Sequence, residues 1–453
     1  MLNHFVSMDK VNQFFDFEIN NNLYDIVDEY GLKPWESVRY EVMLRVLHNS
    51  FSSISKHDRP SIPVRLWNVL CRLTRWSFYT LSHPKKDNLF YLCSRDKING
   101  ILYDKISDKL YNIVDRNNCF SVESMGSYLQ PNYKYGSGVT PDMTAFFAKY
   151  TKYYYDFSEI YNLIKSTFPE CTITIDVMNA CYRQFVTEYK YYKVLFRWCQ
   201  TKRVFVVQNG IRKGLFAAAN ELGIKLIELQ HGQISVNHPA YSYPSECLIP
   251  ASKIYHPDIL LTFGSFWSKN RNYPGVKDLV IGNDSYADSI EMPDTHGNKK
   301  LLVISNHLEG ELLAKRVKEV LARDPEFYFF FKLHPDQYMD YELYKACFEG
   351  FDRVEVVSNQ FTINQLLSQC EGLFLNDSTV ELEALRVGRK VYVLTEQYYL
   401  VMDFVLGEPG IYACKDIDEF LEKYECHKNE RLSPRDDLFS IFNSELAEEI
   451  LEC

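Results

Sequence analysis

Histidine, serine and threonine side chains occur in this sequence directly after short apolar runs, at points where buried strands would end. His231 follows IKLIEL, His334 follows FYFFFKL, and Ser378 with Thr379 follows GLFLND. An imidazole titrates near neutral pH, so it can take up or release a proton from a substrate. Hydroxyls beside the free N–H groups of a helix start can hold an anion such as phosphate. These residue types predict phosphate binding and proton transfer.

The stretch from Glu371 to Leu394, EGLFLNDSTVELEALRVGRKVYVL, must position the serine and threonine. It predicts a buried strand, a polar turn, a short helix from Val380 to Val387 that stops at Gly388, and a second buried strand. Such a β-α-β unit suits neighbouring parallel strands. The hydroxyls would lie at the start of the helix, where the alternative role is simply to cap it.

A third polar loop, containing Ser305, Asn306 and Glu309, follows the strand KLLVI. Loops at the carboxyl ends of parallel strands lie at the same edge of a sheet, which is where open α/β sheets bind ligands. We therefore predict that Ser305 and Asn306 belong to the same site as His334 and Ser378.

Length and charge narrow the classes of protein. A chain of 453 residues is long enough for two domains, and a formal net charge of −10 argues against a nucleic-acid partner. The sequence has no window of about 20 apolar residues and no signal-peptide pattern at its start. The twelve cysteines are scattered, without a CxxC pair, and are typical of reduced core residues. We expect a cytoplasmic protein without disulfides or a zinc site.

The order of predicted elements divides the chain into three parts. Residues 1–85 are mainly helical, residues 86–290 form an α/β domain, and residues 291–453 form a second one after a polar linker at 283–299. In the first α/β domain, NLFYLCS, CFSVESM and TITIDVM are predicted strands that precede the clearer series from Arg203 onward. Two α/β domains joined by one linker predict a ligand cleft between them.

The helix predicted from Pro63 to Leu81 carries Arg65, Arg72 and Arg75 among tryptophan, leucine and phenylalanine residues. A basic amphipathic helix of this kind can lie on an anionic membrane surface. It can equally be a core-facing helix with a solvated basic face. Both interpretations stay open, so peripheral contact with the inner face of the cytoplasmic membrane is one of the two expectations.

Several stretches together carry a family resemblance. They are LQHG with the following HPAYSYP, then PDILLTFGSFW and VIGN, then KLHPD, and finally NDSTVELEALRVGRKVYV. In this order they resemble the two-domain nucleotide-sugar glycosyltransferases of the GT-B fold that build bacterial surface polysaccharides. The nearest groups are the capsule and lipopolysaccharide transferases using CMP-activated sialic acid or Kdo, and the CDP-glycerol glycerophosphotransferases. The resemblance covers about residues 200–425, and it implies two Rossmann-like domains facing across a cleft.

The resemblance also implies residue roles. His334, Ser378 and Thr379 would bind the phosphates of the donor, and Glu383, with Glu381 as its competitor, would hold the ribose. His231 matches the histidine before glycine that is the proposed general base of the glycerophosphotransferase-like group.

A further candidate base is Glu309 in Leu308-Glu309-Gly310. This triplet is similar to the paired-acid-glycine motif of the polysialyltransferases, but it lies in the second domain instead of the first. No DxD pair ends a predicted strand, which favours metal-independent transfer with the nucleotide-sugar as co-substrate and no other cofactor.

Three alternatives belong to other functional classes. The chain could be a CDP-glycerol-type polyol-phosphate transferase. It could also be a UDP-sugar 2-epimerase-like enzyme, since those enzymes share the two α/β domains and a turn resembling Asp377-Ser378 followed by Glu383-Ala384. A non-catalytic scaffold of the polysaccharide machinery is the third alternative. The helical N-terminus and the Gln230-His231-Gly232 loop favour a transferase with a glycan or glycolipid acceptor.

Overall fold

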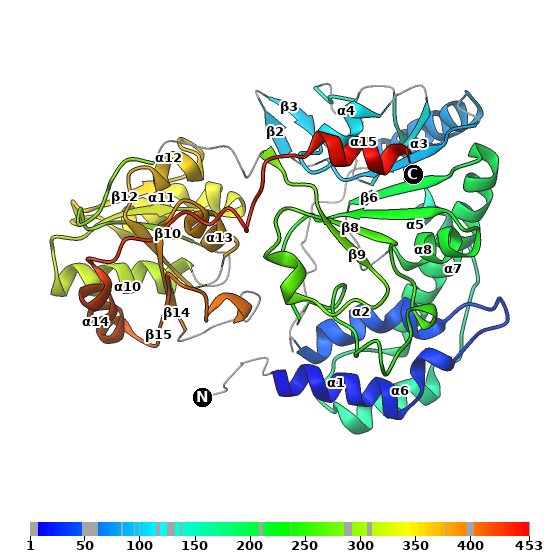
Figure 1. The fold of residues 1–453 in the computed structure, drawn as a ribbon, viewed down its shortest axis with the longest axis horizontal. Coiled ribbons are helices and arrows are strands. Elements are labelled where there is room, and N and C mark those ends of the chain that lie inside the picture. Colours follow the sequence, from blue (N-terminus) through cyan, green and yellow to red (C-terminus); the bar gives the residue numbers. More distant parts are fainter. Residues whose placement is uncertain are drawn as a thin grey trace. The chain divides into compact units, whose positions relative to one another are not determined.

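A computed structural model describes the chain as two compact units, each built on one parallel sheet (Figure 1). The residues described are 8–47, 62–82, 85–94, 96–98, 100–114, 118–124, 132–135, 138–207, 212–236, 238–284, 292–305, 310–376, 378–395 and 403–452. Of these, residues 8–263, 267–282 and 442–452 belong to the larger unit, and residues 264–266 and 283–441 to the smaller one.

The larger unit contains a seven-stranded parallel sheet in the order β5-β4-β1-β6-β7-β8-β9. Its strands are β1 (Asn88–Leu92), β4 (Cys119–Glu123), β5 (Thr140–Pro141), β6 (Arg203–Val207), β7 (Lys225–Leu229), β8 (Ile259–Thr262) and β9 (Lys277–Val280), and a separate antiparallel pair is formed by β2 (Asp96–Ile98) and β3 (Ile101–Tyr103). The central strands β6 and β7 are buried after their first residue and mostly apolar, as expected for strands covered on both faces, with Glu228 as a buried exception.

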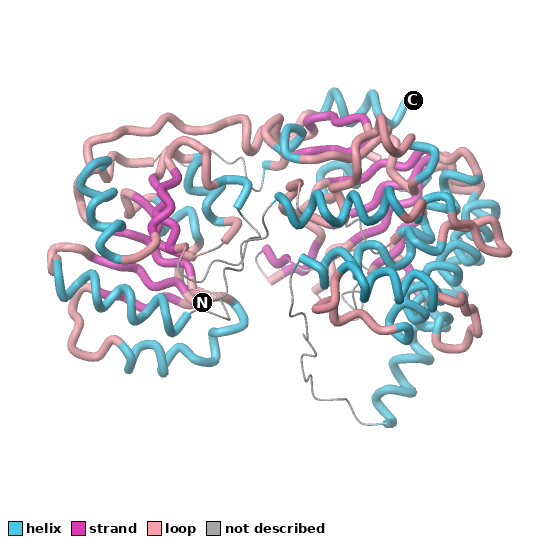
Figure 2. Tube along the Cα trace, turned by 90° about the horizontal axis from the view of Figure 1, so that it is seen from below, coloured by secondary structure: helices cyan, strands magenta, loops and turns pink. Residues whose placement is uncertain are grey.

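Helices cover both faces of this sheet (Figure 2). They are α1 (Met8–Asn20), α2 (Pro34–Leu47), α3 (Ile62–Ser82), α4 (Asp108–Ile113), α5 (Thr144–Ala148), α6 (Ser158–Thr167), α7 (Ile175–Cys199), α8 (Lys213–Glu221) and α15 (Ser444–Glu452), with 3-10 turns η1 (Leu23–Asp25), η4 (Ala251–Lys253) and η5 (Trp267–Asn270). On one face, Leu110 of α4 and Ala447 of α15 share a core with Phe90 and Phe205 of the sheet. None of the described helices combines the length and the apolar character that a membrane crossing requires.

The smaller unit contains a six-stranded parallel sheet in the order β12-β11-β10-β13-β14-β15. Its elements are β10 (Lys300–Ile304), α10 (Gly310–Arg323), β11 (Tyr328–Lys332), η6 (Pro335–Asp340), α11 (Tyr341–Cys347), β12 (Val354–Val357), α12 (Ile363–Leu367), β13 (Gly372–Leu375), α13 (Val380–Arg386), β14 (Lys390–Leu394), η7 (Asp403–Val405), β15 (Ile411–Cys414) and α14 (Ile417–His427).

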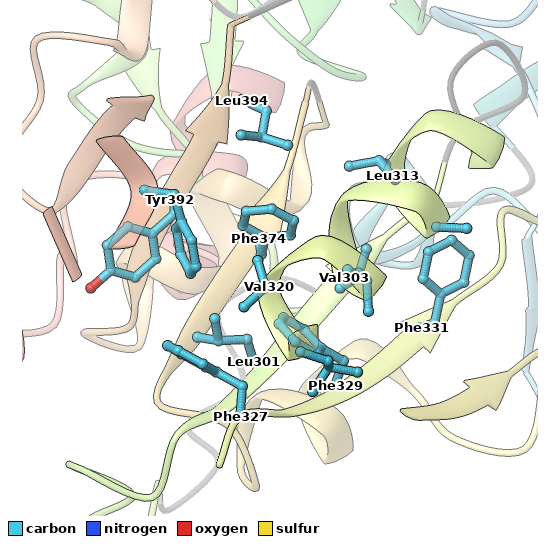
Figure 3. Packing of buried hydrophobic residues seen from close by; sticks show 14 of the residues in the cluster. Leu301, Val303, Leu313, Val320, Phe327, Phe329, Phe331, Phe374, Tyr392 and Leu394 are labelled. Atoms are coloured by element: carbon cyan, nitrogen blue, oxygen red, sulfur yellow. The ribbon is translucent and has the colours of Figure 1, made fainter. Parts of the chain in front are cut away.

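The core of the smaller unit follows from the two periodicities of its sequence. Phe327, Phe329 and Phe331 are two residues apart, so they share one face of the sheet. Leu313 and Val320 of α10 are spaced for one helix face and pack on these rings (Figure 3). This packing fixes the start of α10 and the ends of β10 and β11, where the candidate site lies.

The observed elements confirm the α/β class and most of the predicted strands and helices. One strand prediction is wrong: within TITIDVM, Ile175 begins helix α7, and the side chain of Thr174 caps that helix by accepting a hydrogen bond from the Val177 N–H at 3.3 Å. The alternation of threonine and isoleucine resembles a strand, but the capping threonine and the helical period after it decide the structure. The strand β15 was not predicted.

The division of the chain differs from the predicted one at both ends. The described helices of residues 1–85 belong to the same compact unit as the first α/β domain, and helix α15 at the C-terminal end also packs in that unit. The apolar side chains of α1 and α2 are largely buried, and these helices are part of that unit. The three cysteines that lie in apolar runs of the sequence, Cys93, Cys199 and Cys370, are buried and form no disulfide with a described residue.

Candidate functional site

The strand order of the smaller unit identifies where its sheet would bind a ligand. Numbered along the chain, its strands lie in the order 3-2-1-4-5-6, with β10 and β13 adjacent at the centre. Chain connections leave these two strands in opposite directions, which opens a crevice at their carboxyl ends. Ser305 follows β10 and Asn376 follows β13, so these two residues lie at the carboxyl edge where such a crevice is expected.

Ser305 is fully buried and takes part in a hydrogen-bonded group. Its Oγ donates to Oε1 of Gln337 at 2.8 Å, and the same oxygen accepts the His334 N–H at 3.2 Å. Gln337 also donates through Nε2 to the Tyr344 hydroxyl at 3.0 Å. A Cβ on Gly310 would lie within 2.7 Å of the Ser305, Gln337 and Tyr344 side chains, so only glycine fits at this helix start. Ser305 therefore holds the loop of His334 in place through its side chain.

Asn376 is fully buried, and neither side-chain atom of its amide has a hydrogen-bond partner among the described residues. A buried carboxamide without partners costs free energy in the isolated protein. Such a group at the crevice is accounted for if a ligand supplies the missing hydrogen bonds. From the sequence, Asn376 is only one residue of a polar turn, because a sequence does not reveal which turn residue is buried.

The turn before α13 separates the two acidic residues that competed for the ribose role. Glu381 is buried, and its Oε1 accepts the Ser378 N–H at 3.1 Å. The Ser378 Oγ in turn accepts the Val380 N–H at 3.3 Å. Glu381 thus holds the turn, whereas Glu383 is partly exposed. Thr379 is exposed and makes no side-chain capping bond.

His334 and Lys332 lie at the end of β11, beside β10. The His334 side chain is exposed. Lys332 is only 8% exposed, and its Nζ donates to the Leu333 carbonyl and to the Tyr338 hydroxyl, each at 3.0 Å. It makes no ion pair with any described residue. A buried ammonium group without a carboxylate is rare, because the charge is costly to desolvate. Its position as the one charged residue within FYFFFKL was a signal the sequence offered.

Three residues of the predicted site lie outside the described residues. They are Asn306 and Glu309, in the loop after β10, and Asp377, in the turn before α13. Their roles stay predictions from the sequence.

In the larger unit, His231 follows β7 and is partly buried. Its neighbour Gln230 is fully buried and uses both ends of its amide: Oε1 accepts the Phe263 N–H and Nε2 donates to the Gly232 carbonyl, each at 2.8 Å. Because Phe263 follows β8, Gln230 ties the loop of His231 to the next strand. The backbone on either side of His231 is therefore held at the carboxyl edge of the sheet.

The N-terminal helices brace the continuation of this loop. Arg39 of α2 forms a buried ion pair with Glu18 of α1 at 2.7 Å, and donates to the carbonyls of Pro239 and Ser242 at 2.9 and 2.8 Å. The side chains of Arg39 and Glu18 are almost completely buried. The predicted helical extension thus positions the loop that begins at His231, over a sequence separation of about 200 residues that no local pattern reveals.

A second charged group lies at the start of α8. Arg212 pairs with Glu188 of α7 at 3.0 Å and with Asp142 at 3.2 Å. Glu188 also accepts the Gly214 N–H at 3.2 Å. Burial raises the pKa of the Glu188 carboxyl to about 7, with Arg212 opposing the shift and Asp142 adding to it. One arginine thus forms ion pairs with two carboxylates at this edge of the sheet.

No group of three histidine, cysteine, aspartate or glutamate side chains that could hold a metal ion occurs within the described ranges.

Part of the smaller unit, including its candidate site, matches a known protein family. Residues 308–403 match the sequence model of a family described as capsule polysaccharide biosynthesis protein. This stretch contains Lys332, His334, Asn376, Ser378 and Glu383. A search of curated proteins found no match.

Solved structures with a similar fold include enzymes of nucleotide-sugar chemistry. UDP-GlcNAc 2-epimerase from Neisseria meningitidis, bound to UDP-GlcNAc, has a TM-score of 0.46 at 12% identity, covering 81% of this chain and 100% of that one. UDP-GlcNAc 2-epimerase from Methanocaldococcus jannaschii gives 0.45 at 11%, covering 81% and 98%. Acinetobacter baumannii MurG gives 0.44 at 9%, covering 82% and 100%.

Proposed function

We propose that this chain is a glycosyltransferase that moves a sugar from a nucleotide-activated donor to a hydroxyl of a bacterial capsule or lipopolysaccharide acceptor. The favoured donor is a CMP-sugar such as CMP-activated sialic acid or Kdo, and the reaction is expected in the cytoplasm. The groups at the carboxyl edge of the smaller sheet support this function most directly, because they lie inside the stretch that matches the capsule polysaccharide family.

Those groups suit an anionic donor. Lys332 is a buried cation without a carboxylate among the described residues, and Asn376 is a buried amide without partners there. An exposed imidazole at His334 and the hydroxyls of Ser378 and Thr379 can add hydrogen bonds to a phosphate. We assign Glu383, which is partly exposed, to a ribose hydroxyl, as the family resemblance implies. Together they would hold the nucleotide and stabilise the charge that builds on it as it leaves.

Transfer itself requires a base that takes the proton from the acceptor hydroxyl as its oxygen attacks the anomeric carbon and the nucleotide departs. We assign this role to His231, because Gln230 fixes the loop that carries it at the carboxyl edge of the sheet. Glu309 is the second candidate for the base.

A thermal-shift screen with CMP, CDP, UDP and GDP tests the donor site, since a ligand that binds the native state raises the melting temperature. We expect the cytidine nucleotides to give the largest shift. The variant His334→Ala, and separately Ser378→Ala with Thr379→Ala, should weaken nucleotide binding by about 10-fold to 100-fold, because each removes hydrogen bonds to a charged group. A shift by none of the four nucleotides would contradict the proposal.

Product formation separates transfer from the other candidate functions. His231→Ala should bind nucleotide like the wild type but lose about 10²-fold to 10⁴-fold in transfer rate. His231→Gln should do no better, because an amide cannot take up the proton. Conversion of UDP-GlcNAc to its 2-epimer would support the epimerase alternative, and release of CMP from CDP-glycerol the polyol-phosphate alternative. Nucleotide binding without any turnover would indicate a scaffold.

A further inference from the structure

Helix α3 packs on the larger unit with one face and exposes apolar side chains on another. Its inward face is fixed by Arg75, whose Nε donates to the Val139 carbonyl at 2.9 Å, and by Trp76, whose indole N–H donates to the Tyr191 hydroxyl at 2.8 Å. Leu70, Phe78 and Leu81, spaced for one side of a helix, are exposed. Arg75 thus turns inward, whereas Arg72 is exposed, so the outward side of this helix carries both apolar and basic groups.

The end of α7 extends this exposed face. Trp198 donates its indole N–H to the Thr80 carbonyl of α3 at 3.0 Å, which places the two helix ends side by side. Val194 lies one turn before Trp198 on the same side of α7. Leu70, Phe78, Leu81, Val194 and Trp198, between 47% and 77% exposed, form what we call the α3–α7 face. Single exposed apolar residues are common, but five large ones on two adjoining helices mark an interaction surface.

Basic side chains flank the α3–α7 face. Arg197 is next to Trp198, and Lys85 follows the end of α3; both are exposed, and neither forms an ion pair with another described residue. Lys202 is also exposed and pairs with Asp87 at 3.1 Å. These exposed cations contrast with the net charge of −10 for the whole chain. An anionic partner would therefore be attracted to this face and repelled elsewhere.

We propose that the α3–α7 face docks on the surface of an anionic lipid bilayer. Exposed leucine, phenylalanine and tryptophan side chains would enter the boundary between headgroups and acyl chains, and Lys85 and Arg197 would lie at the level of the phosphates. The indole N–H of Trp198 is already hydrogen-bonded within the protein, so inserting the ring leaves no donor unpaired. This docking does not depend on the nature of the donor.

A second copy of the chain is a less suitable occupant. In a two-fold symmetric contact the same surface meets itself, so the flanking cations of one copy would lie near those of the other. Like charges at an interface oppose association. A phosphate-bearing bilayer meets both the apolar and the basic parts of the face.

Co-sedimentation with vesicles of phosphatidylcholine, with and without phosphatidylglycerol, tests the proposal. The wild type should bind the anionic vesicles in a salt-sensitive manner. The double variant Phe78→Ser, Leu81→Ser should lower the partition coefficient by about tenfold or more, because it removes two inserted side chains. Lys85→Gln with Arg197→Gln should abolish most of the preference for phosphatidylglycerol while leaving the weak binding to phosphatidylcholine.

A matched control removes exposed apolar side chains of the other unit. Met339→Ser with Leu343→Ser, at positions 95% and 64% exposed, should leave vesicle binding unchanged. Because all of these side chains are exposed, circular dichroism and the melting temperature should match the wild type. Wild-type protein that stays in the supernatant with anionic vesicles at low salt would overturn the proposal, as would equal binding by the Phe78 and Leu81 double variant. A concentration-dependent dimer lost in that variant, without lipid binding, would assign the face to a second copy instead.

Discussion

Each of the two sheets has a buried amide side chain directly after one of its strands, and the two amides differ in their hydrogen bonding. Gln230 and Asn376 each directly follow a buried parallel strand and are fully buried, but Gln230 uses both ends of its amide and Asn376 uses neither within the described residues. Lys213 and Lys332 are both buried lysines near these edges. Lys213 lies 3.4 Å from a carboxylate oxygen of Glu36, whereas Lys332 has only neutral partners.

This difference separates two uses of buried polar groups. Where hydrogen bonds and charges are compensated inside the protein, the groups fix the backbone, as Gln230 fixes the loop of His231. Where they are left uncompensated, the isolated protein is less stable and a ligand gains by completing them. Under the proposed function, the compensated groups of the larger unit would hold its loop in place, and the uncompensated groups of the smaller unit would bind the anionic donor.

The largest expected difference in stability is between variants of the two buried lysines. Lys213→Met should destabilise the protein by about 3 to 5 kcal/mol, because it leaves the buried Glu36 carboxylate without its cation. Lys332→Met should be neutral or stabilising for the free protein, because it removes a buried charge that has no partner of opposite sign. Denaturant unfolding of the two variants measures both effects.

The ligand completes the test of the lysine pair. Lys332→Met should weaken CMP binding by about 10-fold to 100-fold and leave cytidine binding unchanged, because only the phosphate needs the cation. Lys332→Arg should restore part of the CMP affinity. Equal losses for CMP and cytidine would indicate a structural role for Lys332.

Glu188 extends the comparison of buried charged groups to the edge of the larger sheet. There, the charge of one arginine is shared between two carboxylates. The pKa of Glu188 is about 7 in the folded protein and near 4.5 in an unfolded chain, so between these values the native state binds more protons. Stability from this group is therefore complete below about pH 4.5 and is lost as the pH rises through 7, by about 3 kcal/mol.

Glu188→Gln removes this titration. The free energy of unfolding of the variant should rise relative to the wild type by about 3 kcal/mol between pH 4.5 and 7, as measured by denaturant unfolding at several pH values. The exposed-carboxylate variant Glu448→Gln controls for general effects of pH. Parallel pH profiles for the wild type and Glu188→Gln would show that the carboxyl stays ionised in the fold.

Much of the fold could be predicted because its strands are short apolar runs bounded by turns. From Arg203 to Leu394 this pattern located β6, β7, β8, β10, β11, β13 and β14, and it placed His231, His334 and Ser378 at their carboxyl ends. The pattern fails where a single residue outweighs it: Thr174 caps α7 and converts an alternating segment into a helix start.

The rest could not be predicted because it depends on contacts between distant parts of the chain. Arg39 reaches carbonyls about 200 residues away, and α15 packs beside α4. The burial of Asn376 and Lys332 likewise depends on how α10, η6 and the sheet pack. Sequence order therefore identified the candidate loops, but not which of their polar groups lack a partner.

The amides give the smallest but most specific contrast. Gln230→Leu should destabilise the protein by about 1 to 3 kcal/mol, because the Phe263 N–H and the Gly232 carbonyl both lose their partner. Asn376→Leu replaces an amide that has no partner among the described residues with an apolar group of similar size. It should leave the free energy of unfolding unchanged or raise it, while weakening nucleotide binding by about tenfold. Denaturant unfolding should therefore show the larger loss of stability in Gln230→Leu. Calorimetry should show the larger loss of nucleotide affinity in Asn376→Leu. If Asn376→Leu is instead as destabilising as Gln230→Leu and binds nucleotide normally, both edges are structural, and the nucleotide site must rely on His334, Ser378 and Thr379 alone.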